Sequence, residues 1–240
     1  MGCKACQVAC KQWNQLPAEK TSFEGNYGNP SHYSASTWTT VKFAEYEEGG
    51  KINWLFSQQS CLHCQDASCK QVCPGGAISH DEMGFVVIDD NRCIGCNYCA
   101  ANCTFKVMSF DKVQGLARKC TLCKDRVSSG LVPACVKACP TGALSFEERG
   151  DIIEHALERK EELIHQGYKE ANVYGLNELE GLNVMYVLPF EPQKYGLPSD
   201  PEVPLKVRVW DYLFKPVRIV LVIALVFALF VNRSDSKVKE

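Results

Sequence analysis

The chain has 240 residues, a formal net charge of −2 at pH 7 and 22% charged side chains. This balance gives no extended field of one sign, so it excludes a protein built around nucleic acid or a strongly acidic substrate. The fifteen cysteines are odd in number and mostly two or three residues apart, in a chain long enough for an ordinary core, so they predict metal ligands rather than a disulfide scaffold.

The first cysteine group lies at the N-terminus and has the spacing C-x2-C-x3-C, with Cys3, Cys6 and Cys10. A full motif has one more cysteine, which would fall just before Met1. Either the sequence starts one or more residues late, or this group holds a three-iron cluster. We favour a late start because every other part of the motif is present.

Residues 37–56 predict a β-hairpin inserted after the first group, because two alternating runs flank a Glu-Glu-Gly-Gly-Lys turn. The runs are Val41 and Phe43, then Ile52, Trp54 and Phe56. The aromatic side chains of this region are predicted to pack against the fold rather than stack on a cofactor. They are Trp38, Phe43, Tyr46 and Trp54.

Two cysteine groups follow the hairpin. The second group is Cys61, Cys64, Cys69 and Cys73, followed by Pro74. The third group is Cys93, Cys96, Cys99 and Cys103, with the full C-x2-C-x2-C-x3-C spacing. Three thiolates on one tight loop reach three irons of a cube, whereas the fourth points away and binds the neighbouring cluster. Residues 85–90 predict a strand and turn leading into the third group.

The fourth group carries an insertion between its second and third cysteines. It is Cys120, Cys123, Cys135 and Cys139, followed by Pro140. Cys73-Pro-Gly-Gly-Ala-Ile and Cys139-Pro-Thr-Gly-Ala-Leu are near copies, which indicates a weak internal repeat. Each repeat predicts a small α+β module whose core is mostly its own clusters, so that folding depends on metal.

Residues 151–166 predict a helix, capped at its start by Asp151 and Glu154 and ended by Gly167. Its apolar side is predicted to contain Ile152, Ile153, Ala156, Leu157, Lys160, Leu163 and Ile164. Residues 182–188 then predict a strand. Residues 189–204 contain five prolines and predict an extended strap over a surface.

Residues 219–231 form an uninterrupted apolar run that is too short to span a bilayer by itself. Extending it back to Leu213 adds Lys215 and Arg218, whose cationic ends can reach the interface, with Trp210 and Tyr212 beside them. We therefore predict a single membrane anchor, with a buried core helix as the alternative. Basic residues flank both ends, so the membrane orientation is not readable.

Cross-ligation predicts which cysteines share a cluster, with groups two and three forming one module and groups one and four the other. In the first of these modules, Cys61, Cys64, Cys69 and Cys103 bind one cluster, and Cys73, Cys93, Cys96 and Cys99 bind another. In the second module, Cys10, Cys120, Cys123 and Cys135 bind one cluster, and Cys3, Cys6 and Cys139 bind the last. Pairing group one with two and three with four is the alternative.

The predicted fold class is therefore α+β, with two ferredoxin-like modules that each hold two [4Fe-4S] clusters, an inserted β-hairpin and a C-terminal transmembrane helix. The predicted divisions are 1–20 with 111–150 for module A, 21–60 for the hairpin region, 61–110 for module B, 151–209 for the helix, strand and strap, 210–232 for the membrane helix and 233–240 for the tail. A zinc-bound scaffold is the alternative from another class, because C-x2-C pairs also make zinc sites.

Other side chains add little catalytic chemistry. His63, inside Cys-Leu-His-Cys, either donates a hydrogen bond to a cluster sulfur or meets solvent or a partner. The basic residues around the fourth group either favour a reduced cluster or form surface salt bridges. They are Arg118, Lys119, Lys124 and Arg126. No phosphate loop, nucleophile–base pair or redox dithiol is present in the pattern, so we predict no catalytic site.

The chain resembles the iron–sulfur (beta) subunit of membrane-bound formate dehydrogenase. The resemblance rests on Gly2-Cys-Lys-Ala-Cys-Gln-Val-Ala-Cys-Lys, Cys61-Leu-His-Cys, Arg92-Cys-Ile-Gly-Cys-Asn-Tyr-Cys, Lys119-Cys-Thr-Leu-Cys-Lys-Asp-Arg and the terminal Phe-Lys-Pro before an apolar run. It covers nearly the whole chain. The same order of cysteine groups also occurs in subunits of molybdenum reductases and hydrogenases, so a sulfur-compound reductase or a hydrogenase is the alternative setting.

The resemblance implies a relay of electrons through four [4Fe-4S] clusters. A catalytic alpha subunit with a molybdenum or tungsten pterin would oxidise formate, and a membrane cytochrome b gamma subunit would receive the electrons and reduce quinone. It also implies a single-pass protein of the cell membrane, with the cluster-bearing domain on the extracytoplasmic face. No nucleic-acid partner is expected.

Overall fold

The computed structural model describes residues 2–23, 25, 27–210 and 212. The elements in chain order are α1 (Ala5–Trp13), β1 (Thr40–Glu48), β2 (Lys51–Gln59), α2 (Ser68–Gln71), β3 (Ile78–His80), β4 (Val86–Ile88), α3 (Tyr98–Ala101), β5 (Ser109–Asp111), β6 (Leu116–Arg118), α4 (Lys124–Val127), α5 (Ala134–Lys137), α6 (Arg149–His165), β7 (Asn172–Tyr174), η1 (Glu178–Glu180), β8 (Tyr186–Leu188), η2 (Pro192–Tyr195) and α7 (Leu205–Val209). The described strands form four two-stranded antiparallel sheets, so the fold is a mixture of short helices and hairpins around the cysteine loops.

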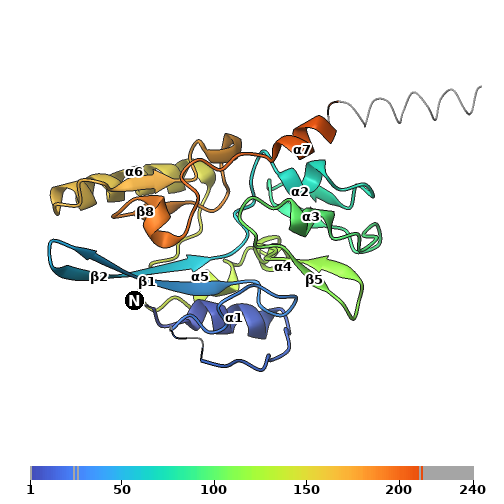
Figure 1. Ribbon diagram of the computed structural model, residues 1–240, viewed down its shortest axis with the longest axis horizontal. Coiled ribbons are helices and arrows are strands. Elements are labelled where there is room, and N and C mark those ends of the chain that lie inside the picture. Colours follow the sequence, from blue (N-terminus) through green and yellow to red (C-terminus); the bar gives the residue numbers. More distant parts are fainter. Residues whose placement is uncertain (1, 24, 26, 211, 213–240) are drawn as a thin grey trace, which may run out of the picture.

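The long hairpin β1–β2 confirms the hairpin prediction and extends it to residues 40–59. Thr40 pairs with Gln59 and Glu48 with Lys51, leaving Gly49 and Gly50 as a two-residue turn. Both glycines have positive φ, 59° and 79°, which is the geometry that a tight hairpin turn requires. In Figure 1 this hairpin lies between α1 on one side and α6 with β8 on the other.

The two faces of the hairpin have different partners. Leu55 and Tyr46 face the C-terminal layer, residues 172–209, where the Tyr46 ring lies 5.9 Å from that of Phe190. On the opposite face Phe56 meets Phe43 edge-on at 5.3 Å, while Trp54 remains 54% exposed. The prediction that the aromatic side chains pack against the fold therefore describes Tyr46 and Phe43 well, but Trp54 is largely a surface residue.

Helix α6 begins at Arg149, two residues before the predicted start, and no side chain caps it. Capping by Asp151 and Glu154 is therefore wrong. The end is as predicted, because Gly167 follows the last turn and Tyr168 N–H donates to the Leu163 carbonyl.

The predicted apolar side of α6 is also partly wrong. Ala156 and Leu163 are buried, but Leu157 and Ile164 are 42% and 36% exposed. Only a narrow stripe of the helix contacts the sheet β7–β8, so Leu157 and Ile164 face outward while Ile152 and Ile153 are partly buried.

The C-terminal layer supplies most of the larger of the two hydrophobic clusters. Its buried residues include Tyr174, Leu182, Leu188, Leu197, Val203 and Val207. The predicted strand over 182–188 is regular only at 186–188, where it pairs with β7, although Leu182 also forms an isolated bridge with Cys64. The proline-rich stretch contains η2 and is anchored by buried side chains, so it is less extended than predicted.

Two further predictions concern the C-terminus. The predicted transmembrane helix over 210–232 and the tail over 233–240 lie almost entirely outside the described residues. Among the residues that the structure describes, no helix is long and apolar enough to cross a membrane. The last described helix, α7, packs against α2.

Candidate metal centres

Each cysteine loop contains a residue in the left-handed backbone region. These residues are Lys4, His63, Gly95, Asn97 and Leu122, with φ values of 60°, 49°, 68°, 62° and 52°. Alternating right- and left-handed residues turn successive backbone N–H groups toward one point and create a concave site for an anion. All four C-x2-C motifs are therefore shaped around a negatively charged centre.

Backbone N–H groups also donate directly to cysteine sulfurs. The donor–sulfur distances are 3.3 Å from Ala77 to Cys73, 3.4 Å from Leu122 to Cys120 and 3.5 Å from Ala134 to Cys123. Such bonds favour the thiolate, which is the form that binds metal. All fifteen cysteines are free of disulfides, so every thiol remains available as a ligand.

The first set of neighbouring thiols is called the N-terminal set: Cys3, Cys6 and Cys139. Helix α1 carries Cys6 and packs against α5, and Cys139 follows that helix. Burial raises the pKa of the Cys6 thiol, and the thiols of Cys3 and Cys139 raise it further. Burial also raises the pKa of Cys139, but hydrogen bonds from Thr141 and Leu144 outweigh it and lower the value.

The first central set is Cys10, Cys120, Cys123 and Cys135. Burial raises the pKa of the Cys10 thiol, and the other three thiols add to the rise. For Cys135 the pKa rises to about 12, first through burial and then through Cys120 and Cys123. Two of these cysteines are buried and two are half-buried, and their thiolates repel one another, so the positive charge of bound iron would stabilise the set.

The second central set is Cys61, Cys64, Cys69 and Cys103, and the outer set is Cys73, Cys93, Cys96 and Cys99. Burial raises the pKa of Cys64, followed by the effects of the three other thiols of its set. Burial likewise raises the pKa of Cys99 to about 11, and its neighbours are the other three thiols of the outer set. These groupings match those that the spacing predicts, and the assignment of each thiol to a particular cluster stays a prediction.

Electrostatic effects between thiols of different sets indicate which sets are neighbours. The Cys6 thiolate raises the pKa of Cys135, Cys61 raises that of Cys120, and Cys99 raises that of Cys69, each in addition to the larger effect of burial. Each effect pairs one set with the next, which supports the order N-terminal, first central, second central and outer.

Two cavities coincide with three of the four thiol sets, and no thiol of the second central set lines either cavity. A cleft of about 1430 Å³ is lined by all seven thiols of the N-terminal and first central sets, together with β2 and α6. A cavity of about 20 Å³ is lined by all four thiols of the outer set and by apolar residues such as Ile78 and Ile88. Among the described residues, no group of three or more His, Cys, Asp or Glu is placed to bind a single metal ion. The residues present fit larger anionic iron–sulfur groups, which place thiolates around several irons.

His63 is buried completely, so the expectation that it meets solvent is wrong. Its Nδ1 accepts a hydrogen bond from Val86 N–H at 3.0 Å, while its Nε2 has no partner within the described part of the chain. Burial, and then the charge of Lys119, lower the pKa of His63 well below its ordinary value. The ring is therefore neutral with its proton on Nε2, an N–H donor suited to a cluster sulfur.

The four basic residues near the fourth group separate into two kinds. Arg118 pairs with Asp90 at 2.8 Å and Lys124 with Asp81 at 3.2 Å, as expected for salt bridges near the surface. Arg126 lies over the Trp13 ring, 4.3 Å from its centroid. Lys119 differs from all three because it is only 3% exposed.

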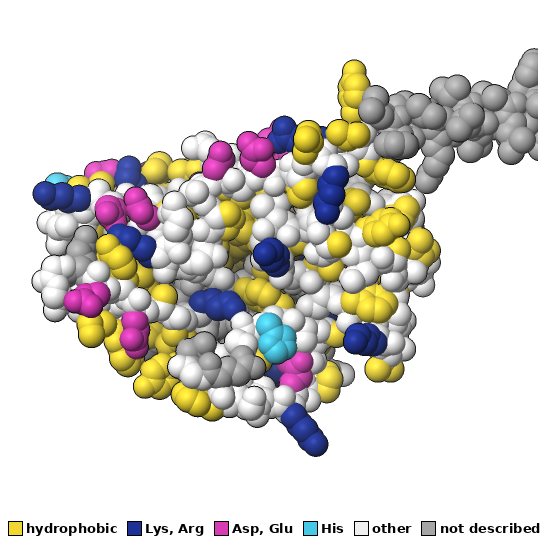
Figure 2. Space-filling model, in the orientation of Figure 1, with side chains coloured by type: hydrophobic (Ala, Val, Ile, Leu, Met, Phe, Trp, Pro, Cys, Tyr) yellow, Lys and Arg dark blue, Asp and Glu magenta, His cyan; other side chains and the backbone are white. Residues whose placement is uncertain are grey.

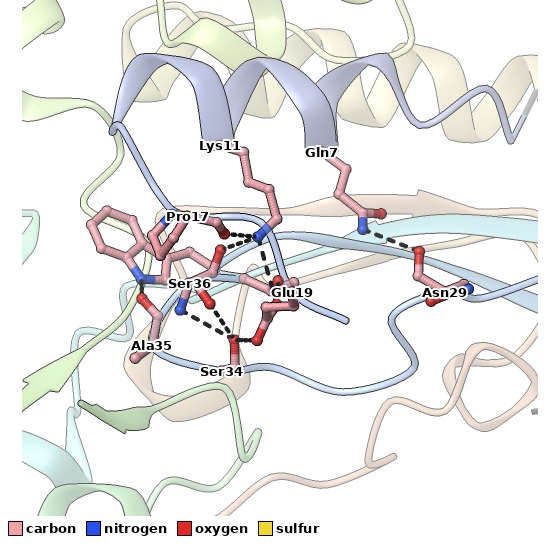
Figure 3. Close-up of polar contacts among 10 residues, drawn as sticks. Gln7, Lys11, Pro17, Glu19, Asn29, Ser34, Ala35 and Ser36 are labelled. Carbon is pink, nitrogen blue, oxygen red and sulfur yellow. Dashed lines mark hydrogen bonds and ion pairs between the residues drawn. The ribbon is translucent and has the colours of Figure 1, made fainter. Parts of the chain in front are cut away.

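A polar cradle under α1, shown in Figure 3, was not predicted from the sequence. Lys11 Nζ donates to the carbonyls of Pro17 and Ser36 at 2.9 and 2.6 Å and lies 3.5 Å from a Glu19 oxygen. Glu19 in turn accepts hydrogen bonds from Ser34 and Thr37. The cradle holds the loop after α1 in place, and with it the helix that carries Cys6 and Cys10. No short motif signals it, because its members are spread from Lys11 to Thr37.

Charge on the surface is dispersed. Figure 2 shows Lys and Arg side chains scattered singly over the face drawn, with Asp and Glu among them. This agrees with the small net charge and gives no basic patch on that face.

Comparison with known proteins gives consistent results. Two family models described as 4Fe-4S dicluster domains match residues 52–149 and 1–77. The chain is 44% identical over 220 residues to the nitrate-inducible formate dehydrogenase iron-sulfur subunit of Escherichia coli, covering 90% of this chain and 75% of that protein. It is 40% identical to the formate dehydrogenase iron-sulfur subunit of Haemophilus influenzae, covering 90% and 71%. A thiosulfate reductase electron transfer subunit, PhsB of Salmonella typhi, is 40% identical over 61% of this chain and 69% of its own length. Two dicluster domains imply four 4Fe-4S clusters.

Proposed function

The chain belongs to the family of formate dehydrogenase iron-sulfur subunits, as an electron-transfer subunit without a catalytic site of its own, and from this we propose its place in a relay. Electrons would come from a catalytic subunit that carries a molybdenum or tungsten pterin and oxidises formate. They would leave to a membrane cytochrome b that reduces quinone. Bound [4Fe-4S] clusters would supply the one-electron chemistry that such a relay needs.

The observation that carries this proposal is the row of four thiol sets. Its ends are the N-terminal set beside the hairpin and the outer set beside α3. A row has two separate ends, which suits a subunit that receives electrons from one partner and delivers them to another. The thiols and the N–H groups around them hold the redox groups in that order. In the N-terminal set this sequence supplies three thiols, and the expectation of another cysteine ahead of Met1 stays a prediction.

The surroundings of the two ends suggest which partner belongs where. Near the N-terminal set, the Tyr27 ring lies 5.8 Å from that of Trp54, and both are more than half exposed, which suits a protein interface. Away from that set, α7 packs on α2, which carries Cys69 of the second central set and precedes Cys73 of the outer set, and α7 leads to the exposed Tyr212 and the predicted membrane anchor. We therefore assign electron entry to the N-terminal set and exit to the outer set. By family resemblance we place the cluster domain on the extracytoplasmic face of the cell membrane.

The test uses the complex purified anaerobically from its source. Formate should reduce the clusters, seen as new electron paramagnetic resonance signals, and a quinone analogue should reoxidise them. Iron and acid-labile sulfide should match four clusters per chain. A colourless chain that contains zinc instead would overturn the proposal.

A second candidate follows from the similarity to the thiosulfate reductase subunit. In that setting the same thiol sets would deliver electrons to a sulfur compound. Oxidation of the pre-reduced complex by thiosulfate, with no response to formate, would identify this alternative.

A further inference from the structure

Lys119 is a buried cation without a carboxylate partner among the described residues. Its Nζ donates hydrogen bonds to the carbonyl oxygens of Val86 and Cys120, the latter at 2.8 Å. The neighbouring bases Arg118 and Lys124 each pair with an aspartate, so acidic side chains are within reach of this segment but do not meet Lys119.

The position of Lys119 joins the two central sets. It directly precedes Cys120 of the first central set. Val86, which accepts its hydrogen bond, donates its own N–H to His63 in the loop of the second central set. Lys119 is thus a charged side chain that is connected by hydrogen bonds to the loops of both central sets.

Two neutral carbonyls do not balance a buried ammonium, because removing a full charge from water is far more costly than a hydrogen bond recovers. The available counter-charge lies in the two central thiol sets. A cluster bound by four thiolates is anionic and gains one more negative charge on reduction. A nearby cation therefore favours the reduced form and raises the reduction potential.

We propose that Lys119 is a counter-cation shared by the two central clusters, and that it raises their reduction potentials relative to those of the end clusters. This rests on the proposed function, since it requires clusters in the sets described above. Lys119 acts through charge and binds no iron. Its role is to keep the middle of the row accessible to electrons arriving from the N-terminal set.

The experiment is a redox titration of the purified complex, followed by electron paramagnetic resonance. Lys119→Met removes the charge and the donors, Lys119→Gln removes the charge but keeps a donor, and Lys119→Arg keeps the charge. Lys124→Met is the matched control, since it removes a partly exposed cation next to Cys123. We expect Met and Gln to lower the reduction equilibrium constants of two clusters about tenfold, or about 59 mV for a one-electron couple. Lys119→Arg and Lys124→Met should leave the reduction potentials of all four clusters close to those of the unsubstituted complex.

The outcomes separate this inference from the proposed function. Four clusters with unchanged potentials in Lys119→Met and Lys119→Gln would overturn the role of Lys119 and leave the relay intact. Loss of clusters in Lys119→Met and Lys119→Gln but not in Lys119→Arg would support the role of the positive charge, because only the variant that keeps the charge would assemble its clusters. Loss in all three variants, Arg included, would overturn it in favour of a packing role. An unsubstituted complex without four clusters would refute the proposed function itself.

Discussion

Gly95 offers a sharp test of the shape of the cluster loops. It lies between Cys93 and Cys96 with φ of 68°, and a Cβ added there would be 2.4 Å from the carbonyl oxygen of Gly115. Gly130 has a similar φ of 74°, but a Cβ there would have open space within 4 Å. The pair of substitutions Gly95→Ala and Gly130→Ala therefore separates backbone strain from steric overlap.

The left-handed conformation should cost about 1–2 kcal/mol with alanine at either position. The overlap at Gly95 adds roughly 1–3 kcal/mol, because backbone rather than a flexible side chain must move. We therefore expect Gly95→Ala to be less stable than Gly130→Ala by about 1–3 kcal/mol. With a urea slope of roughly 1–3 kcal/mol/M, this corresponds to a midpoint lower by about 1 M.

The assay follows visible absorbance of the anaerobically purified complex during urea unfolding, together with its iron content. Gly95→Ala should lose the outer-set cluster first, while Gly130→Ala should keep all four. Equal midpoints and equal iron content in the two variants would refute the argument that close approach of the Gly115 carbonyl shapes this loop.

Three other substitutions test separate parts of the fold and site. Cys96→Ser should remove one cluster from the outer set and stop quinone reduction by the complex; unchanged turnover would contradict a serial relay. Leu182→Ala, at a fully buried position, should lower the free energy of unfolding by about 2–5 kcal/mol, and a loss below 1 kcal/mol would show that the C-terminal layer is not a packed core. Glu19→Gln should destabilise the cradle under α1 by roughly 2 kcal/mol at neutral pH. Burial opposes ionisation of Glu19, but hydrogen bonds from Ser34 and Thr37 prevail and lower its pKa below 4.5, so its contribution is complete above pH 4.5 and disappears as the pH falls through the lower folded value. A variant that matches the unsubstituted chain at pH 7 would contradict this.

The hairpin was accessible from sequence because it depends on local spacing, whereas the thiol groupings that the spacing indicates stay a prediction. Two glycines between alternating runs determine a tight turn, and cysteines two residues apart on a loop have little choice of direction. The short strand β7 was not predictable. Its three residues pair with β8 only because the C-terminal layer folds back over the hairpin, which is information carried by distant contacts.

The sequence pattern also did not predict which charged and polar side chains are buried. His63 and Lys119 both adjoin ligand cysteines, where loops are usually exposed, and nothing in composition distinguishes Lys119 from Lys124. These side chains are buried because of the direction in which the backbone points them. The left-handed backbone at His63 turns its ring inward, and Lys119 leaves strand β6 toward the interior, where Val86 supplies a carbonyl. The predicted apolar side of helix α6 was partly wrong for the same reason, since Leu157 is apolar but exposed in the part of the chain that the structure describes.

The nested order of the cysteine groups has a consequence for assembly. The second central and outer sets close loops of about forty residues or fewer, whereas Cys3 must meet Cys139 from the other end of the cysteine-bearing region. Loop-closure entropy grows only with the logarithm of length, so this roughly threefold longer loop costs about 1 kcal/mol more. That is small beside metal-binding free energies of about 10 kcal/mol or more, as known for structural zinc sites, so nesting does not prevent assembly. The lengths of the loops still rank the sets. The N-terminal set closes the longest loop and contains the exposed Cys3, so it should be the last to assemble and the first to lose iron.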